Sequence, residues 1–239
     1  PSGPDAARSK APRPLADRLR PSRLADVIGQ DHLLGAQGAL RIMLDAGALS
    51  SLVLWGPPGV GKTTIARLLA QETSLHFVQI SAIFTGVPDL RKVFEAARIR
   101  HANGQGTLLF VDEIHRFNKA QQDGFLPHME DGTILLVGAT TENPSFELNA
   151  ALMSRAQVLV LNRLDQVALD RLIAQAEVEF DHPLPLAPDA RLALCVMADG
   201  DGRALLNLVE QVAAWKLDAP LGAEALGQRL QRRAALYDK

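Results

Sequence analysis

A glycine-rich loop directly after a short apolar segment limits this chain to a few possible folds. Residues 56–63 read Gly-Pro-Pro-Gly-Val-Gly-Lys-Thr, and the Ser-Leu-Val-Leu-Trp run before them predicts a buried strand. The spacing G-x-x-x-x-G-K-[ST] is typical of a loop whose backbone N–H groups surround phosphate groups at the start of a helix. Lys62 is expected to reach the outer phosphates, and the Thr63 hydroxyl to take one Mg²⁺ position. The expected nucleotide contacts are Gly56, Pro57, Pro58, Gly59, Val60, Gly61, Lys62, Thr63 and Thr64.

Apolar segments alternate with amphipathic ones through the first two thirds of the chain. Strands are expected at 52–55, 75–80, 107–111, 133–138 and 157–161, with helices at 62–72, 89–101, 119–130 and 148–153 between them. This alternation predicts an α/β fold with a parallel sheet covered on both faces. After residue 162 the pattern predicts only helices, at 165–180, 189–197, 202–216 and 223–236.

The composition fits a globular protein with one large and one smaller domain. The chain has 239 residues, 47% hydrophobic content and a formal charge of −2. No apolar run is long enough to span a membrane, and the first residues lack the apolar core of a signal peptide. We therefore expect a cytoplasmic protein without a membrane contact. Cys195 lies in an apolar helical pattern and is expected to be buried and unreactive.

Two adjacent carboxylates end the apolar segment at 108–113. In open α/β sheets, ligands bind at the carboxyl ends of the strands. Because neighbouring strand residues point in opposite directions, Asp112 is expected to approach Mg²⁺ while Glu113 faces the water that attacks the γ-phosphate. The second carboxylate favours ATP hydrolysis over binding alone.

Three further residues are candidates for phosphate chemistry. Thr141 ends the segment 133–141 and is chosen as the hydrogen-bond partner of the attacking water or the γ-phosphate, although it is also suited to starting a turn. Arg203 lies in the first turn of an expected helix, where the helix dipole disfavours a cation, so we expect an anion to bind there. Arg155 follows a short helix, where a cation is favourable, and spacing alone does not decide between a structural and a functional role.

Together these motifs resemble the AAA+ ATPases, and within them the replication-associated recombination protein A group, which is related to the eukaryotic Werner-helicase-interacting ATPase. The resemblance covers nearly all of residues 15–239. Its most specific stretches are 15–21, 27–35, 110–123 (Phe-Val-Asp-Glu-Ile-His-Arg-Phe-Asn-Lys-Ala-Gln-Gln-Asp) and 138–147 (Gly-Ala-Thr-Thr-Glu-Asn-Pro-Ser-Phe-Glu). It implies a P-loop AAA+ domain over 15–162, with a parallel five-stranded sheet in the order 5-1-4-3-2, and a small all-helical lid domain over 163–239. Residues 1–14 are expected to be flexible.

The resemblance also implies roles for single residues. Thr141 takes the sensor 1 position, Arg203 takes the sensor 2 position, and Arg155 acts in trans on the nucleotide of a neighbouring subunit. The segments with Pro21, Val27 and Ile28 resemble those that enclose adenine. Because related clamp loaders place basic residues against DNA on the helix after the second strand, Arg91 and Lys92 are candidate DNA phosphate contacts, with a solvated helix face as the alternative.

The function that the resemblance implies is a Mg²⁺-dependent, DNA-stimulated ATPase. It would act at stalled replication forks, gaps or DNA ends in replication restart and recombination, in the bacterial cytoplasm and associated with the nucleoid. The implied partners are single-stranded, forked or gapped DNA, single-strand-binding protein and further copies of the chain, as a tetramer at full length. Family members continue beyond the position of Lys239 into an oligomerising region, so weak turnover and a monomer are expected for residues 1–239 alone.

Three other functions remain open at this point. The first is a protein-remodelling AAA+ machine, because Phe84-Thr85-Gly86 resembles an aromatic pore loop, although we expect Phe84 to be buried. The second is a Holliday-junction branch-migration motor, which carries a β-hairpin before sensor 1 for which residues 115–132 have no room. The third is a clamp-loader-like subunit that only binds ATP, against which the presence of both Glu113 and Arg155 argues.

Overall fold

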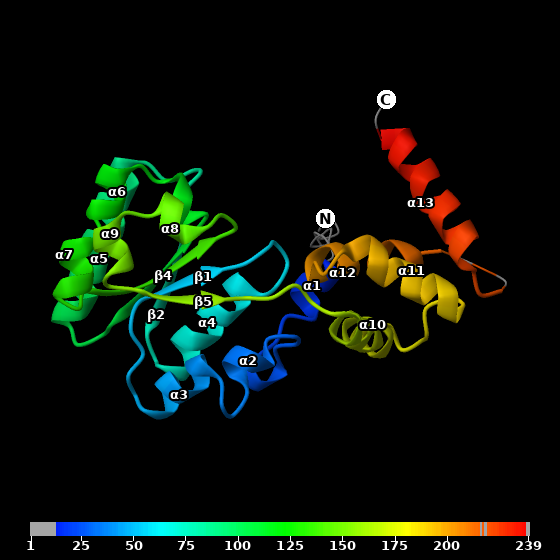
Figure 1. Ribbon diagram of the computed structural model, residues 1–239, viewed down its shortest axis with the longest axis horizontal. Coiled ribbons are helices and arrows are strands. Elements are labelled where there is room, and N and C mark those ends of the chain that lie inside the picture. Colours follow the sequence, from blue (N-terminus) through cyan, green and yellow to red (C-terminus); the bar gives the residue numbers. More distant parts are fainter. Residues whose placement is uncertain (1–12, 216, 218, 238–239) are drawn as a thin grey trace, which may run out of the picture.

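The chain forms a five-stranded sheet followed by a group of helices (Figure 1). The computed structural model describes residues 13–215, 217 and 219–237, so the expected flexible segment 1–14 lies almost entirely outside the described residues. The strands are β1 (Leu52–Trp55), β2 (His76–Ser81), β3 (Thr107–Asp112), β4 (Ile134–Thr140) and β5 (Gln157–Val160). Neighbouring strands are parallel and follow the order β2-β3-β4-β1-β5, which confirms the expected order 5-1-4-3-2.

The register of the strands brings their carboxyl ends to one edge of the sheet. Trp55 at the end of β1 pairs with Thr140 at the end of β4, and Ser81 at the end of β2 pairs with Asp112 at the end of β3. β1, β3 and β4 are buried along nearly their whole length, as expected for parallel strands covered on both faces. The polar residues that follow these strands therefore lie close together.

Helices cover the two faces of the sheet, and β3 divides its side chains between them. Leu108 and Phe110 pack in a cluster with helix α4, whereas Leu109 and Val111 pack in a second cluster with helix α5. This alternation follows from the period of two in a strand. The elements of this part are η1 (Leu24–Asp26), α2 (Asp31–Leu34), α3 (Ala39–Asp45), α4 (Lys62–Glu72), α5 (Val87–Ala102), η2 (Ile114–Arg116), α6 (Lys119–Asp123), α7 (Leu126–Glu130), α8 (Pro144–Glu147) and α9 (Ala150–Met153).

The helices differ from the expectations at several places, among them η1, α2 and α3, which precede β1 where no element was expected. The helix expected at 119–130 is divided into α6 and α7, with Gly124 and Phe125 between them. Pro127 has no N–H to continue the hydrogen bonds of α6, but it is well suited to the first turn of a new helix, α7. The short helix α8 was not expected; Asn143 caps it through its side chain, and Pro144 occupies its first turn.

The helices after the sheet form their own apolar core. They are α10 (Gln166–Phe180), α11 (Pro188–Ala198), α12 (Gly202–Ala213) and α13 (Ala223–Tyr237), and the expected end of α12 at residue 216 falls on a residue outside the described part. Leu15 from helix α1 (Leu15–Arg18) and Ile28 are also buried in this core, so the segment before the sheet packs against the C-terminal helices. Cys195 is buried there, as expected. Within the described part of the chain, we find no helix that has both the length and the apolarity to cross a membrane.

Candidate nucleotide-binding site

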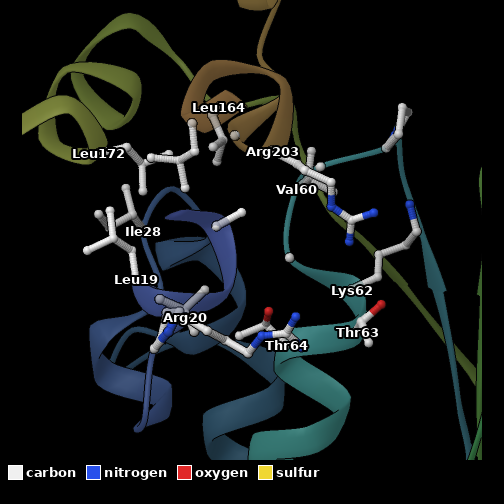
Figure 2. Close-up of a pocket in the computed structure, with 18 of the residues that line it drawn as sticks. Leu19, Arg20, Ile28, Val60, Lys62, Thr63, Thr64, Leu164, Leu172 and Arg203 are labelled. Atoms are coloured by element: carbon white, nitrogen blue, oxygen red, sulfur yellow. The ribbon is translucent and has the colours of Figure 1, made fainter. Parts of the chain in front are cut away.

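A cavity of about 470 Å³ lies where the carboxyl edge of the sheet meets the C-terminal helices (Figure 2). It contains most of the residues singled out from the sequence. Its lining includes the loop and helix start Pro58, Gly59, Val60, Gly61, Lys62, Thr63 and Thr64, the strand-end residues Asp112, Glu113 and Thr141, Arg203, and the N-terminal residues Pro21, Val27 and Ile28. The fold thus assembles one site from five separate parts of the chain.

The glycine-rich loop owes its shape to backbone conformations that favour glycine. Gly59 has φ +70° and Gly61 has φ +101°, both in the region that L side chains rarely adopt. Because the N-cap residue Gly61 has no side chain, it leaves the first N–H groups of α4 without a side-chain cap. Such N–H groups, together with the positive end of the helix dipole, favour an anion at this position.

Lys62 is held inside the loop. Its side-chain Nζ donates 2.7 Å hydrogen bonds to the backbone carbonyls of Gly56 and Pro57, and the residue is 8% exposed. Burial lowers the pKa of the Lys62 ammonium, whereas the carboxylates of Glu113 and Asp112 act in the opposite direction. The loop therefore holds a poorly hydrated cation beside two acids, at the place where phosphate groups would enter.

The two carboxylates at the end of β3 have different backbone settings. Asp112 is the last residue of the strand, and Glu113 follows it with φ +54°, an uncommon conformation for a residue other than glycine. Asp112 lines the cavity together with Thr63. A hydroxyl and a carboxylate suit Mg²⁺, which prefers oxygen ligands and usually keeps several waters and substrate phosphates in its coordination shell.

The turn after β4 separates two neighbouring threonines. Thr141 lines the cavity, whereas Thr140 is fully buried and its Oγ1 lies 2.9 Å from His115 Nδ1. The hydroxyl of Thr140 also accepts a 3.0 Å hydrogen bond from the backbone N–H of Glu142. Thr141, the threonine preferred from the sequence, is therefore the one that lines the cavity together with the carboxylates.

Arg203 reaches the cavity from the C-terminal helices (Figure 2). Asp201 caps α12 by accepting a 2.9 Å hydrogen bond from the Ala204 N–H, which leaves Arg203 in the first turn. The backbone N–H of Gly202 donates a 3.1 Å hydrogen bond to the carbonyl of Gly59. The helix that carries Arg203 is therefore bound directly to the glycine-rich loop.

The opposite end of the cavity is mainly apolar. Leu19, Ile28, Leu164 and Leu172 line it, as Figure 2 shows. Such a surface suits the flat face of a purine base.

A residue that the sequence analysis did not single out, Gln30, fixes this wall. It is fully buried, and its amide donates to the carbonyls of Asn162 at 2.8 Å and Val60 at 3.4 Å and accepts from the Asn162 N–H at 3.1 Å. A glutamine inside a largely apolar motif is a signal for such a role, but its partners, 30 and 132 positions away, are visible only in the fold.

Comparison with known proteins identifies the family. A family model described as "ATPase family associated with various cellular activities (AAA)" matches residues 52–164. Replication-associated recombination protein A of Escherichia coli (strain K12) is 47% identical over 206 residues, which cover 84% of this chain and 46% of that protein. ATPase WRNIP1 of Dictyostelium discoideum is 38% identical over 256 residues, which cover 97% of this chain and 29% of that protein. This chain is a member of the AAA+ ATPase family.

The relatives also confirm the resemblance to the replication-associated recombination protein A group. The AAA+ chain spans about half the length of the bacterial relatives that it matches. Among solved structures, the Holliday junction branch migration motor RuvB of Thermotoga maritima has a similar fold, with a TM-score of 0.73 and 27% identity over 89% of this chain and 72% of that one. The described residues 115–132 of the AAA+ chain contain η2, α6 and α7 and no β-hairpin.

Arg155 lies away from the nucleotide cavity of the AAA+ chain. It precedes β5 and lines a second cavity with Ser51, Thr107 and Ile134, which lie before or at the amino ends of β1, β3 and β4. Its guanidinium contacts Glu130 Oε1 at 2.6 and 2.7 Å. Arg155 and the nucleotide cavity of the same AAA+ chain are therefore at opposite edges of the sheet.

The two candidate DNA contacts of the AAA+ chain, Arg91 and Lys92, are exposed on α5. Lys92 lies 3.6 Å from Asp89, an exposed ion pair of the kind that contributes little to stability. The expectation that Phe84 is buried is wrong, because this residue is 85% exposed. It lies in the turn between β2 and α5, and such connecting segments usually run over the protein surface. An aromatic side chain therefore lies in solvent shortly before the basic helix α5.

Proposed function

We propose that this chain is the ATP-hydrolysing part of a Mg²⁺-dependent, DNA-stimulated AAA+ ATPase that acts at stalled replication forks, gaps or DNA ends. The observation that carries this proposal is the cavity itself. It brings Lys62, Asp112, Glu113 and Arg203 together beside an uncapped helix start and an apolar wall. The relatives named for replication-associated recombination support the choice of process, replication restart and recombination.

Each group of residues in the cavity has its own role in ATP hydrolysis. The glycine-rich loop and Lys62 bind the phosphates, and Thr63 and Asp112 would hold Mg²⁺, which neutralises charge on the phosphate oxygens when bound. Glu113 orients the water whose oxygen attacks the γ-phosphorus while the bond to the β,γ-bridging oxygen breaks, giving ADP and phosphate. Thr141 and Arg203 bind the γ-phosphate or the attacking water. Pro21, Val27 and Ile28 enclose the adenine base.

In this proposal, a neighbouring copy of the chain supplies one more cation, Arg155, to the nucleotide site. Arg155 lies at the opposite edge of the sheet from its own cavity, which supports action in trans on the nucleotide of an adjacent subunit. We therefore propose a homo-oligomer, a tetramer at full length, with little turnover by residues 1–239 alone. Single-stranded, forked or gapped DNA and single-strand-binding protein are the proposed partners, in the bacterial cytoplasm at replication forks. Arg91 and Lys92 are proposed to contact DNA phosphates.

One experiment tests the core of this proposal. ATP turnover by the intact protein is measured side by side with single-stranded, gapped, forked and blunt DNA, for the unmodified protein and Glu113→Gln. We expect stimulation by at least one DNA form, and loss of turnover with retained ATP binding in the variant. Unchanged turnover by Glu113→Gln would contradict the assigned role of Glu113, whereas no turnover by the unmodified protein with any DNA would support the clamp-loader-like alternative.

A second candidate function is favoured by one observation. Phe84 is exposed and precedes Thr85 and Gly86, as in the aromatic loops with which protein-remodelling machines hold a polypeptide. The same turnover assay separates the two functions if an unfolded protein is added as a further sample. Stimulation by the unfolded protein and by no DNA would favour remodelling.

A further inference from the structure

A buried histidine links the two strand ends that carry Glu113 and Thr141. His115 Nε2 lies 3.3 Å from Glu113 Oε2, and His115 Nδ1 lies 2.9 Å from Thr140 Oγ1. The His115 side chain is 6% exposed, and Thr140 is fully buried. Polar atoms buried in this way contribute most when every donor has an acceptor. The three side chains form a line of polar contacts from the cavity to the turn after β4, with a hydrogen bond between Thr140 and His115 and a 3.3 Å contact between His115 and Glu113.

The polar contacts of His115 select one arrangement of protons for a neutral imidazole ring. The Thr140 Oγ1 accepts from the Glu142 N–H at 3.0 Å. If the Thr140 hydroxyl donates to His115 Nδ1, then Nε2 carries the proton of the neutral ring and faces Glu113 Oε2 at 3.3 Å. If the hydroxyl instead donates to the Glu142 carbonyl at 3.2 Å, Nδ1 must be the donor, and the neutral ring has no proton for Glu113. The first arrangement satisfies both contacts of the ring, and we adopt it.

The backbone around His115 is held in place by packing against β4. His115 belongs to the turn η2, which begins directly after Glu113. Ile114 in this turn is fully buried against β4: a Cβ at Gly138 would lie 2.8 Å from Ile114 Cδ1. The absence of a side chain at Gly138 thus lets η2 lie directly on β4. The imidazole is therefore carried by a turn that cannot move independently of the strand leading to Thr140.

We propose that His115 is a positioning residue, which holds one oxygen of Glu113 and couples the orientation of this carboxylate, through Thr140, to the turn that carries Thr141. This inference rests on the proposed role of Glu113 in ATP hydrolysis. Glu113 is 24% exposed, so without a partner its carboxylate is free to adopt several rotamers. With Oε2 in contact with His115, the other oxygen is available to the water in the cavity. A shift of the Thr140 to Glu142 turn on phosphate binding would pass to Glu113 through the imidazole.

The test uses paired substitutions in the intact protein. Thr140→Val removes the hydroxyl with little change in volume, and Thr140→Ser keeps it. His115→Asn keeps a polar atom near the Nδ1 position but cannot reach Glu113, and His115→Gln keeps one near the Nε2 position but cannot reach Thr140. The measured quantities are kcat at saturating ATP, the ATP dissociation constant, and Tm.

We expect Thr140→Val, His115→Asn and His115→Gln to lower kcat by roughly tenfold or more, as for other residues that orient a catalytic group, with ATP affinity within about twofold. Thr140→Ser should retain the original kcat, and the double variant Thr140→Val, His115→Gln should be no slower than His115→Gln alone, because both changes break one coupled path. A merely structural role would instead lower Tm and ATP affinity together with kcat.

The result that overturns the inference differs from the one that overturns the proposed function. If Glu113→Gln abolishes turnover while Thr140→Val and His115→Asn stay within about twofold of the original kcat, the coupling through His115 is wrong and the role of Glu113 stands. If Glu113→Gln leaves turnover unchanged, the role of Glu113 in the proposed function is itself wrong. Should the His115 variants not fold, the comparison of Thr140→Val with Thr140→Ser still decides.

Discussion

The carbonyl of Gly59 accepts a 3.1 Å hydrogen bond from the backbone N–H of Gly202. This bond joins the phosphate-binding loop to the start of α12, the helix that carries Arg203. The approach is close: a Cβ added at Gly59 would clash with the Asp201 carboxylate, so this side chain, which caps α12, would have to turn away. Binding of phosphate by the loop and placement of Arg203 are therefore mechanically connected.

The substitution Gly59→Ala should disturb this connection. We expect it to weaken ATP binding at least about tenfold, equivalent to about 1.4 kcal/mol, because the Asp201 side chain must turn away from the loop and lose its cap hydrogen bond to α12. The positive φ of Gly59 adds a cost of about 1 kcal/mol to folding. ATP affinity by titration and Tm by calorimetry measure the two effects separately.

Gly47→Ala is the matched control for this prediction. Gly47 has φ +61°, and a Cβ there would meet nothing within 4 Å, so only the backbone cost applies. We expect a similar loss of stability with unchanged ATP affinity. Equal ATP affinities of the Gly59→Ala and Gly47→Ala variants would show that the contact with α12 does not matter for nucleotide binding.

Arg155 should be required by the neighbouring subunit and not by its own. We expect Arg155→Ala to lower kcat of the assembled enzyme by roughly 10³, the lower end of the range for arginine fingers. Glu113→Gln subunits keep Arg155 but have an impaired centre, so mixing the two inactive variants should restore part of the turnover. The measurement is turnover as a function of the mixing ratio.

An exposed arginine at the other end of β5 provides the control for the mixing experiment. Arg163 is exposed and pairs with Asp199, so Arg163→Ala should leave turnover close to normal. An inactive mixture at every ratio, in oligomers shown to contain both variants, would argue that Arg155 does not act in trans.

Reversing the charges of Arg91 and Lys92 should weaken DNA binding. If both side chains contact phosphates, the double change to Glu should lower DNA affinity and reduce the slope of log affinity against log salt by about 2. The double variant Arg41→Glu, Arg171→Glu changes the net charge equally, at exposed positions on α3 and α10. Affinities of both variants for single-stranded DNA at several salt concentrations are compared. The assignment is wrong if both double variants weaken binding equally.

A buried histidine should make the stability of this protein pH-dependent. His128 packs against Phe94 with ring centroids 4.2 Å apart, and burial, followed by the charge of Arg98, lowers the pKa of its imidazole. As the pH falls, the unfolded chain binds the proton first, near pH 6.5, and the folded chain only at a lower pH. The free energy of unfolding should therefore decrease below about pH 6.5, by at most about 1.4 kcal/mol per pH unit for this one group.

Substitution separates His128 from other titrating groups. His128→Leu should remove this part of the pH dependence, and His101→Leu, at an exposed position on α5, should not. Chemical unfolding at pH 7.5, 6.5 and 5.5 gives the required free energies. Parallel curves for the original protein and His128→Leu would show that the imidazole is not kept neutral by burial.

The features that were predictable from the sequence are those set by local pattern. The strand before the glycine-rich loop, the loop itself and the two acids after β3 follow from spacing and polarity, and the order of the strands followed from the resemblance. Contacts between distant segments could not be predicted from the sequence, because they depend on no local pattern. Gln30 finds its partner at Asn162, and His115 meets Thr140, only after the sheet has formed. The exposure of Phe84 depends on how the turn after β2 lies in the folded protein.

The separation of Arg155 from its own cavity sets a direction for any assembly. If Arg155 of one copy completes the nucleotide site of the next, two different surfaces of the chain must meet. In an open row of copies, the surface with Arg155 stays free at one end and the surface with the nucleotide cavity stays free at the other. Successive copies then point the same way. In a closed ring every nucleotide site receives Arg155 from a neighbour, whereas in an open row the terminal site lacks it. Loss of one contact would therefore inactivate one site and leave the others active.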